Sequence, residues 1–286
     1  MSSPMRVRVL QVPARDSDFW RAQFAQACQA ADWDYVEYWG GDEPALAEGR
    51  SALIVGWDAS GASLAPDHWI ILGCTPEEAI SVSEASLHLP RPDAIYHTSN
   101  RFALCSTLAV AGAAVFQNTD AFIETPGLGR ISRHQIEFDS VTDPASPLSL
   151  YEVLPPAPGV RVHWPADLFV YPTKDGSPGG SPTIGLLGRR RLLLNGPNIA
   201  LPAGAWQAKA SFYLDPPGKA DLLIEWGFGV SVASFHQILE REGLYELTLT
   251  HVWPEAAPAD FRISLMMPAL DGTLEMRGLD LSHVPA

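Results

Sequence analysis

Trp206-Gln-Ala-Lys-Ala-Ser-Phe212 is the stretch that decides the fold of the last third of the chain, because apolar residues alternate strictly with polar ones. Successive side chains of an extended strand point to opposite faces, so this pattern predicts a strand with one buried face. Further alternating segments lie at 222–226, 245–249, 261–267 and 274–276. Turn sequences such as Asp215-Pro-Pro-Gly218 separate them. Five or more strands of this kind predict an antiparallel, jelly-roll-like β-sandwich over residues 183–286.

The first 118 residues follow a different pattern, in which short apolar runs alternate with helix signals. Strands are predicted at 6–12, 35–39, 52–56, 69–73, 94–98 and 114–117. Helices are predicted over 75–85, which opens with a threonine cap and a proline, and over 100–114. This β-α-β alternation predicts an α/β domain over 1–118 with a Rossmann-like, mainly parallel open sheet.

The helix expected after the first strand shows the clearest apolar face. Trp20, Phe24 and Cys28 recur every four residues, as on one side of a helix. Asp16 or Ser17 precedes them and is the expected cap. The face of three large side chains is therefore predicted to pack on the sheet.

Residues 119–182 break this alternation, because proline and glycine interrupt each short apolar run. The richest pieces are Thr125-Pro-Gly-Leu-Gly129, Leu154-Pro-Pro-Ala-Pro-Gly159 and Asp175-Gly-Ser-Pro-Gly-Gly-Ser-Pro182. Clusters of this composition mark turns and loops. We therefore expect 119–182 to be a packed connector with a few short strands. The last of the three pieces is the expected boundary before the sandwich.

Composition excludes several classes of protein. The chain has 286 residues, 47% hydrophobic and 18% charged, as expected of an ordered protein large enough for two cores. Its 19 basic and 33 acidic residues give a net charge of −14, which disfavours nucleic acid as a partner. No run approaches 18 apolar residues and no signal peptide is apparent, so we expect no membrane span. The expected location is the cytoplasm, with surface or particle association left open.

The sequence contains no complete catalytic motif. G-x-G-x-x-G, P-loop, H-E-x-x-H and G-x-S-x-G patterns do not occur, so no cofactor, metal or catalytic residue is predicted. Three widely spaced cysteines, Cys28, Cys74 and Cys105, form no disulfide framework. They are expected to be buried, reduced thiols.

A family resemblance begins at Gly196-Pro-Asn-Ile-Ala-Leu-Pro-Ala-Gly-Ala-Trp206 and continues at Leu223-Ile-Glu-Trp-Gly227. The stretch resembles the β-sandwich modules that accompany bacterial proteins of surface-polysaccharide metabolism. It covers about a third of the chain and consists mostly of turn residues. Asn198 stands where such modules more often carry an aromatic residue.

This resemblance implies carbohydrate binding, since sugars present apolar C–H faces to aromatic rings and hydroxyls to carboxylates and amides. The candidate ligand-binding residues are Tyr213, Glu225, Trp226, Phe228, His236 and Trp253. Phe235 and His251 lie close to them in sequence, and each ring has a competing interpretation as sandwich core. Trp206, in phase with Phe212, is predicted to be core, whereas Tyr213 is out of phase and should face outward.

The most polar cluster of the first domain is Tyr96-His-Thr-Ser-Asn-Arg101. The strand predicted at 94–98 places it at a strand-to-helix junction, where open α/β sheets bind ligands. His97 can then act as a base and Arg101 can pair with an anion, while Ser99 or Asn100 caps the next helix. The alternative is a capped helix with a hydrogen-bonded histidine.

Two Asp-x-Asp triplets, Asp16-Ser-Asp18 and Asp32-Trp-Asp34, raise the alternative of a glycosyltransferase-like enzyme. Paired carboxylates can hold a divalent metal against a nucleotide diphosphate. Both triplets also lie where a helix cap or a turn requires a carboxylate.

Three functions stay open. The first is a non-catalytic protein of bacterial surface-polysaccharide handling, in which the sandwich binds glycan and the α/β domain supports it or docks a partner. The second is a glycosyltransferase-like enzyme that uses the α/β domain. The third is a structural or assembly protein, in which the sandwich is the surface of a homo-oligomer. The fold alone does not decide among them.

Overall fold

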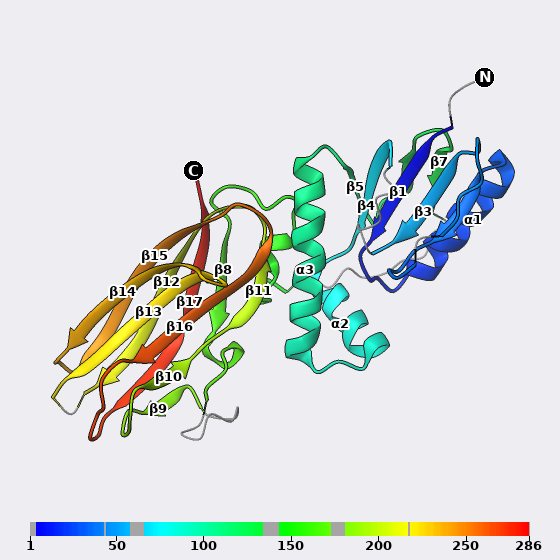
Figure 1. Cartoon of the computed structure of the whole chain (residues 1–286). Coiled ribbons are helices and arrows are strands. Elements are labelled where there is room, and N and C mark those ends of the chain that lie inside the picture. The colour runs from blue at the N-terminus through cyan, green and yellow to red at the C-terminus, as the bar shows by residue number, and fades with distance from the viewer. Residues whose placement is uncertain are drawn as a thin grey trace. The chain divides into compact units, whose positions relative to one another are not determined.

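The computed structural model describes residues 4–42, 44–57, 66–133, 143–172, 181–216 and 218–285. The chain divides into two compact units, Met1–Asp143 and Pro144–Ala286 (Figure 1). The first contains a parallel sheet with helices, and the second is built almost wholly from strands. The α/β and all-β characters predicted from the sequence are thus both present.

The α/β unit is built on five parallel strands. They are β1 (Arg6–Gln11), β2 (Asp34–Glu37), β3 (Ala52–Gly56), β4 (His68–Gly73) and β5 (Ala114–Gln117), in the order β2-β3-β1-β4-β5. The first three strands of a Rossmann sheet are ordered 3-2-1, whereas β3 here separates β1 from β2. The parallel open sheet is confirmed, and the finer Rossmann-like assignment is not.

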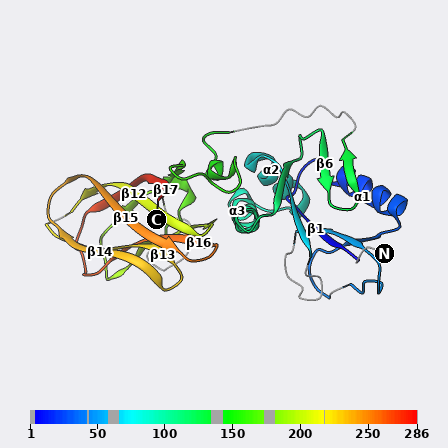
Figure 2. The same cartoon turned by 90° about the horizontal axis from the view of Figure 1, so that it is seen from above.

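Helices cover both faces of this sheet (Figure 2). Helix α1 (Ser17–Ala31) lies on one face, and its Trp20, Phe24 and Cys28 side chains are fully buried against the strands, as its spacing predicts. The hairpin of β6 (Phe122–Thr125) and β7 (Gly129–Ser132) adds to the same core. Helices α2 (Pro76–Leu87) and α3 (Arg91–Val110) cover the other face.

One strand prediction in this unit is wrong. Residues 94–98 belong to α3, which begins at Arg91 with Pro92 in its first turn. Proline favours the first turn of a helix, because its missing N–H has no partner there anyway. The buried positions of α3 follow helical spacing, and they are Ala94, Ile95, Thr98, Ser99, Phe102, Ala103, Cys105 and Ser106. A helical period was therefore present where a strand was predicted.

The second unit is a sandwich of two antiparallel sheets that face each other (Figure 2). The β12 sheet has the order β15-β12-β17-β8, with β9 also paired to β17. Its strands are β8 (Arg161–Pro165), β9 (Thr183–Gly185), β12 (Gly204–Asp215), β15 (Gly243–Trp253) and β17 (Thr273–Val284). The antiparallel sandwich predicted from period-two alternation is confirmed.

The β13 sheet has the order β10-β16-β13-β14, with β11 paired to β16. Its strands are β10 (Arg191–Leu194), β11 (Pro197–Leu201), β13 (Ala220–Phe228), β14 (Ser231–Leu239) and β16 (Ala257–Leu265). Successive strands from β11 onward alternate between the two sheets except at the β13–β14 hairpin. Two 3₁₀ turns, Ser149–Tyr151 and Ala166–Leu168, precede and follow β8.

Large rings fill the space between the two sheets. Those that are fully buried are Trp164, Trp206, Trp226, Trp253, Phe212 and Phe261. Trp206 lies in the core as its phase predicts, and its indole Nε1 donates to the carbonyl of Pro202 at 3.0 Å. This packing holds the strands of both sheets in place and so fixes the spacing of the backbone positions on their outer faces.

The segment expected as a connector contributes to both units. Its first part forms the β6–β7 hairpin, and its later part contains β8 and β9 of the β12 sheet. The expected boundary at 175–182 falls largely on residues 173–180, which lie outside the described residues.

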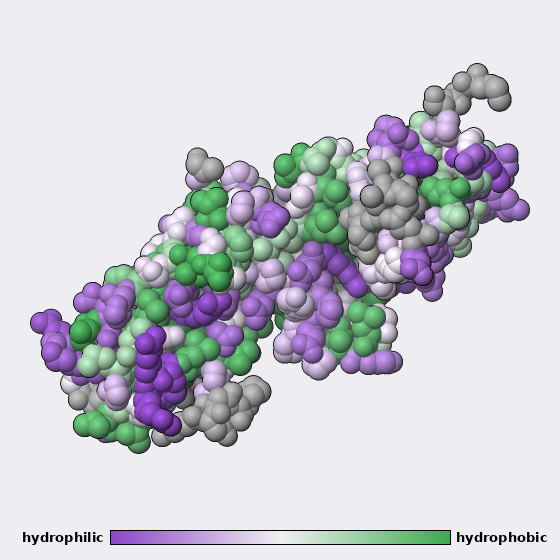
Figure 3. Space-filling model, viewed as in Figure 1, coloured by the Kyte–Doolittle hydropathy of each residue, from purple (hydrophilic) through white to green (hydrophobic). Residues whose placement is uncertain are grey.

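The surfaces of both units mix polar and apolar residues (Figure 3). Single exposed apolar residues are normal on folded proteins. Within the described ranges, no helix is both long and apolar enough to cross a bilayer. All three cysteines are buried, and burial raises the pKa of the Cys28 and Cys105 thiols to about 12.

Candidate functional site

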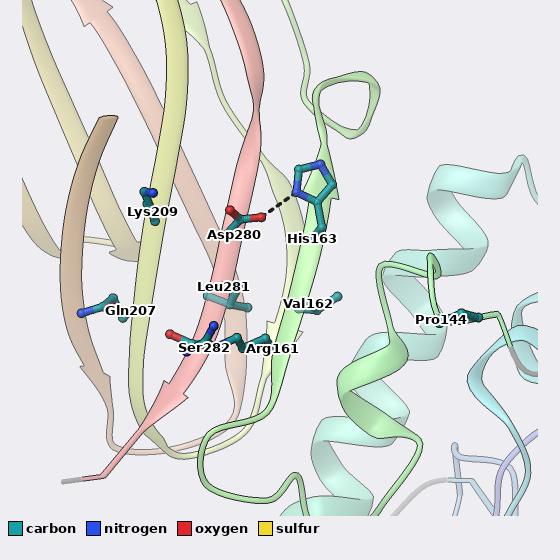
Figure 4. Close-up of a pocket in the computed structure, with 9 residues that line it drawn as sticks. All are labelled: Pro144, Arg161, Val162, His163, Gln207, Lys209, Asp280, Leu281 and Ser282. Carbon is teal, nitrogen blue, oxygen red and sulfur yellow. Dashed lines mark hydrogen bonds and ion pairs between the residues drawn. The ribbon is translucent and has the colours of Figure 1, made fainter. Parts of the chain in front are cut away.

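A polar hollow lies on the outer face of the β12 sheet (Figure 4). Its volume is about 530 Å³, within the range of about 300–1,000 Å³ that small-molecule sites occupy. Six polar side chains from β8, β12 and β17 line it, namely Arg161, His163, Gln207, Lys209, Asp280 and Ser282. We call this cavity, with its six polar lining residues, the polar hollow.

Strand register brings three of these side chains, Arg161, Ser282 and Gln207, into one row. Ser282 of β17 lies opposite Arg161 of β8 on one side and opposite Gln207 of β12 on the other. Residues opposite each other in an antiparallel sheet project to the same face. Arg161 and Gln207 are two strand spacings apart, about 10 Å. An elongated ligand can therefore contact all three at once.

A second row runs parallel to the first. His163 Nδ1 and Asp280 Oδ1 lie 2.7 Å apart, and Asp280 also lies opposite Lys209. Lys209 Nζ pairs with Glu246 Oε1 of β15 at 2.9 Å. Gly278 has a φ of 138°, and a Cβ there would stand 2.6 Å from Cε1 of the His163 ring. Glycine at this position leaves the room that the imidazole occupies.

The chemistry of the hollow is that of hydrogen bonding and charge. Gln207 and Ser282 offer both donors and acceptors, and the Arg161 and Lys209 side chains donate. In the part of the chain that the structure describes, no three His, Cys, Asp or Glu side chains are placed to hold a metal ion. The arrangement suits a ligand rich in hydroxyl groups.

Two of the predicted ligand-binding rings are inaccessible. Trp226 is 0% exposed and Trp253 is 1% exposed, with their ring centroids 5.1 Å apart. The indole of Trp226 donates to the carbonyl of Trp206 at 3.2 Å. Both rings point inward because their positions are in phase with the apolar face of their strands. The prediction that they stack on a sugar is therefore wrong.

Glu225 and His236 lie on a different surface, the outer face of the β13 sheet. Glu225 is opposite Arg262 of β16, and His236 lies on the edge strand β14. His236 Nε2 is 2.6 Å from Asp221 Oδ1. These side chains are half-buried or exposed, but the core separates them from the polar hollow.

Phe228 and His251 meet at one end of the sandwich. Their ring centroids lie 5.7 Å apart, and His251 Nε2 is 3.2 Å from Ser231 Oγ. Both rings are half-buried, whereas Phe235 on β14 is 37% exposed. Burial lowers the pKa of His251 below its usual 6.5.

This pKa shift predicts a pH dependence of stability. The unfolded chain protonates His251 as the pH falls through about 6.5, while the folded chain still holds it neutral. Stability is therefore present above that pH and declines as the pH falls toward the lowered folded pKa. We expect His251→Phe to lose less stability between pH 7.5 and 5 than the wild type does, as measured by urea unfolding. An equal loss in both proteins would contradict the burial effect, and His97→Gln, at an exposed helical position, serves as the control.

Tyr213 faces outward, as its phase predicts. It lies on the same face of β12 as Gln207 and Lys209, four residues beyond the latter. Its hydroxyl donates to the Glu242 carboxylate, and this bond raises the pKa of Tyr213. Among the six sandwich residues predicted to bind ligand, Tyr213 alone shares a surface with the hollow.

The alternative pocket on α3 is not assembled. His97 is exposed, Ser99 is buried and bonds to the Tyr96 carbonyl within the helix, and Asn100 Nδ2 donates to the same carbonyl at 2.8 Å. Arg101 lies 4.6 Å from the Trp57 ring, and burial lowers its pKa. The cluster is in mid-helix, so the prediction of a strand-to-helix junction is wrong, and its side chains point in different directions.

The first Asp-x-Asp triplet splits between two environments. The Asp16 side chain is 1% exposed, and its Oδ2 lies 3.2 Å from the guanidinium of Arg133. Asn118 Nδ2 donates to its Oδ1 at 3.4 Å, and burial raises the pKa of Asp16. Asp18 is 89% exposed and pairs with Arg21. The predicted side-chain cap is also wrong, because Asp16 makes no capping hydrogen bond.

The second triplet is held by a single arginine. Asp32 ends α1 in a left-handed conformation, and its Oδ1 lies 2.7 Å from Arg50. Asp34 Oδ1 lies 3.2 Å from the same guanidinium. Both carboxylates are thus already paired with a guanidinium. Neither triplet therefore supports the glycosyltransferase-like alternative.

None of the six residues of the polar hollow was predicted from the sequence as a binding residue. Gln207 and Lys209 were noted only as the polar partners in an alternating strand. Arg161 and His163 alternate with Val162 and Trp164 in the same way, but the segment was assigned to a connector. The sequence does show that polar residues alternate with buried apolar residues along each of these strands. It does not show that the strands are neighbours in one sheet, and only that strand order brings the polar side chains together.

Comparisons with known proteins give no family. No family model and no curated protein sequence matches the chain. TmCBM61 in complex with β-1,4-galactotriose is 13% identical over 34% of this chain and 66% of that chain, with a TM-score of 0.27. The CBM36-1 domain of a multidomain xylanase from the hindgut metagenome of Trinervitermes trinervoides is 7% identical over 44% and 100%, with a TM-score of 0.29.

A longer match is the Glycosylation Associate Protein (Gap123) complex from Streptococcus agalactiae. It is 11% identical over 88% of this chain and 50% of that chain, with a TM-score of 0.30. The matched regions thus span less than two thirds of TmCBM61 and of the Gap123 chain. At these TM-scores the likenesses identify neither a family nor a ligand for this chain.

Proposed function

We propose that the sandwich binds glycan in the polar hollow, and that the chain is a non-catalytic carbohydrate-binding protein of bacterial surface-polysaccharide handling. In this proposal the α/β unit supports the sandwich or docks a partner. The observation that carries the proposal is the hollow itself, in which six polar side chains from three adjacent strands project to one side of a rigid sheet.

The composition of the hollow supports a hydroxyl-rich ligand. Sugar hydroxyls donate and accept hydrogen bonds, and Gln207, Ser282 and Asp280 can satisfy both roles. The side chains stand on strands instead of loops, which holds their spacing within the narrow limits that recognition requires. A rigid row also lowers the entropy lost on binding.

The proposal is tested first on a glycan array and then by isothermal titration with the best ligand found. We expect Lys209→Ala to weaken binding by about tenfold or more, since hydrogen bonds to charged groups contribute about 1.5–3 kcal/mol. Gln207→Ala should weaken binding by about two- to tenfold, since hydrogen bonds between neutral groups contribute about 0.5–1.5 kcal/mol. Both side chains project from an outer face, so the variants should fold as the wild type does.

The matched controls are Glu225→Ala and His236→Ala on the outer face of the β13 sheet. Neither is expected to change the affinity. If these two weaken binding while the hollow variants do not, the glycan lies on the other sheet and the proposed site is wrong. An array without any bound glycan, together with a defined oligomer in light scattering, would favour the assembly function.

A further inference from the structure

One cationic side chain of the polar hollow has no described partner. Lys209 is neutralised by Glu246 at 2.9 Å, and Asp280 is bound to His163 at 2.7 Å. Arg161 is exposed, and its guanidinium has no hydrogen bond or ion pair with any described residue. Among the described residues, the hollow therefore presents one guanidinium without an ion-pair partner, in a chain whose net charge is −14.

The hollow also lacks a flat apolar platform. None of the nine residues that line the hollow is a tryptophan, tyrosine or phenylalanine. Tyr213 lies on the same face, but four residues along the strand from Lys209 and with its hydroxyl bound to Glu242. Stacking on sugar C–H faces, a main source of affinity for neutral sugars, is thus weak here. Affinity must come from hydrogen bonds and charge, and charge-assisted bonds are roughly twice as strong as neutral ones.

We infer that the polar hollow selects acidic glycans, with Arg161 as the residue that binds the sugar carboxylate. This inference rests on the proposed glycan-binding function and names the ligand class for it. A guanidinium presents two parallel N–H donors that match the two oxygens of a carboxylate. The register places Ser282 and then Gln207 beside it in the same row.

This geometry assigns a direction to the bound ligand. The carboxylate lies at the β8 edge, and the hydroxyls of the same or the next sugar follow the row across β17 to β12. Figure 4 shows Arg161 and Ser282 close together, with Gln207 on the neighbouring strand. Asp280, held by His163 in the second row, is free on its other oxygen to accept a sugar hydroxyl.

The experiment uses pairs of ligands that differ in charge alone. Oligogalacturonides and hyaluronan oligosaccharides are compared with their methyl esters, and a sulfated oligosaccharide is included to separate carboxylate from sulfate recognition. Titration is carried out on the full chain with wild type, Arg161→Gln, Arg161→Lys and the control Arg189→Gln. Arg189 is also exposed and without a described partner, but it lies in the loop before β10, outside the hollow.

We expect the wild type to prefer an acid over its ester by at least tenfold, and the preference to fall with added salt. Arg161→Gln should abolish the preference, Arg161→Lys should keep part of it, and Arg189→Gln should leave it unchanged. Equal binding of acid and ester, or a preference that survives Arg161→Gln, would overturn the inference while leaving glycan binding intact. Binding that prefers sulfate over carboxylate would overturn the carboxylate assignment. No binding of any glycan, acidic or neutral, would overturn the proposed function as well.

Discussion

Replacement of Trp226 by alanine is expected to lower the free energy of unfolding of the sandwich by about 3–5 kcal/mol, the usual cost of truncating a buried aromatic ring. Trp226 is 0% exposed, and its ring lies 6.1 Å from that of Trp164 and 5.1 Å from that of Trp253. The substitution removes a hydrogen bond to the backbone of Trp206 and leaves a cavity between the sheets. Urea unfolding of the full chain, with hydrogen exchange to assign each transition to its unit, measures the loss.

The matched control for this variant is Phe235→Ala on β14. Phe235 is 37% exposed, so its truncation should cost much less than that of Trp226. A Trp226→Ala protein as stable as the wild type but without glycan binding would mean that the ring is accessible. That result would restore the stacking role that its burial removes.

Asp16→Ala is expected to destabilise the α/β unit by about 3–5 kcal/mol. Asp16 is an anionic partner of Arg133, and removing one partner of a buried ion pair is strongly destabilising. The Arg133 side chain is 8% exposed and the Asp16 side chain 1% exposed, so water cannot replace the lost carboxylate. Asn118 loses one of its acceptors at the same time, although it keeps Glu78. The measurement is again urea unfolding, read on the transition of the first unit.

Asp18→Ala is the control two residues away. Its carboxylate is 89% exposed and pairs with Arg21 on the surface, where such pairs contribute about 0–1 kcal/mol. Asp16→Asn should fall between the two, because the amide keeps the size of the side chain and one acceptor. If Asp16→Ala and Asp18→Ala lower the free energy of unfolding equally, the buried ion pair contributes no more to the stability of the unit than the surface pair does.

The sequence predicted the sandwich well wherever one face of a strand is buried. In β12 and β13 the apolar residues Phe212 and Ile224 point inward while their neighbours point outward, so the period of two is visible in the letters. β14 was not predicted, because the burial of its side chains does not alternate. Five successive residues, Ser234 to Ile238, are exposed on it, and no burial difference imposes alternation.

The first part of helix α3 was predicted as a strand because its buried face is not marked by apolar residues. Its buried face contains small and polar residues such as Thr98, Ser99 and Ser106, which lack the apolar contrast that reveals a helical period. Ile95 and Tyr96 have good strand propensity and favoured a strand locally. The packing of α3 against the sheet overrides that local preference.

The residues of the candidate site could not be identified from any local pattern in the sequence. Arg161 and Ser282 are opposite each other in the sheet but 121 positions apart in the chain. Aromatic residues were the natural candidates for a sugar site, and two of them, Trp226 and Trp253, lie in the sandwich core. Polar residues on alternating strands are common, so their convergence follows from strand order, which no local pattern contains.

The central position of β17 in the β12 sheet has a consequence for biosynthesis. β17 pairs with both β12 and β8, so it is the strand that joins the two sides of the hollow. A nascent chain that has emerged from the ribosome only through β16 holds Arg161 and Gln207 without the strand between them. The row of Arg161, Ser282 and Gln207 is therefore complete only after β17 has been synthesised and has paired with both of its neighbours.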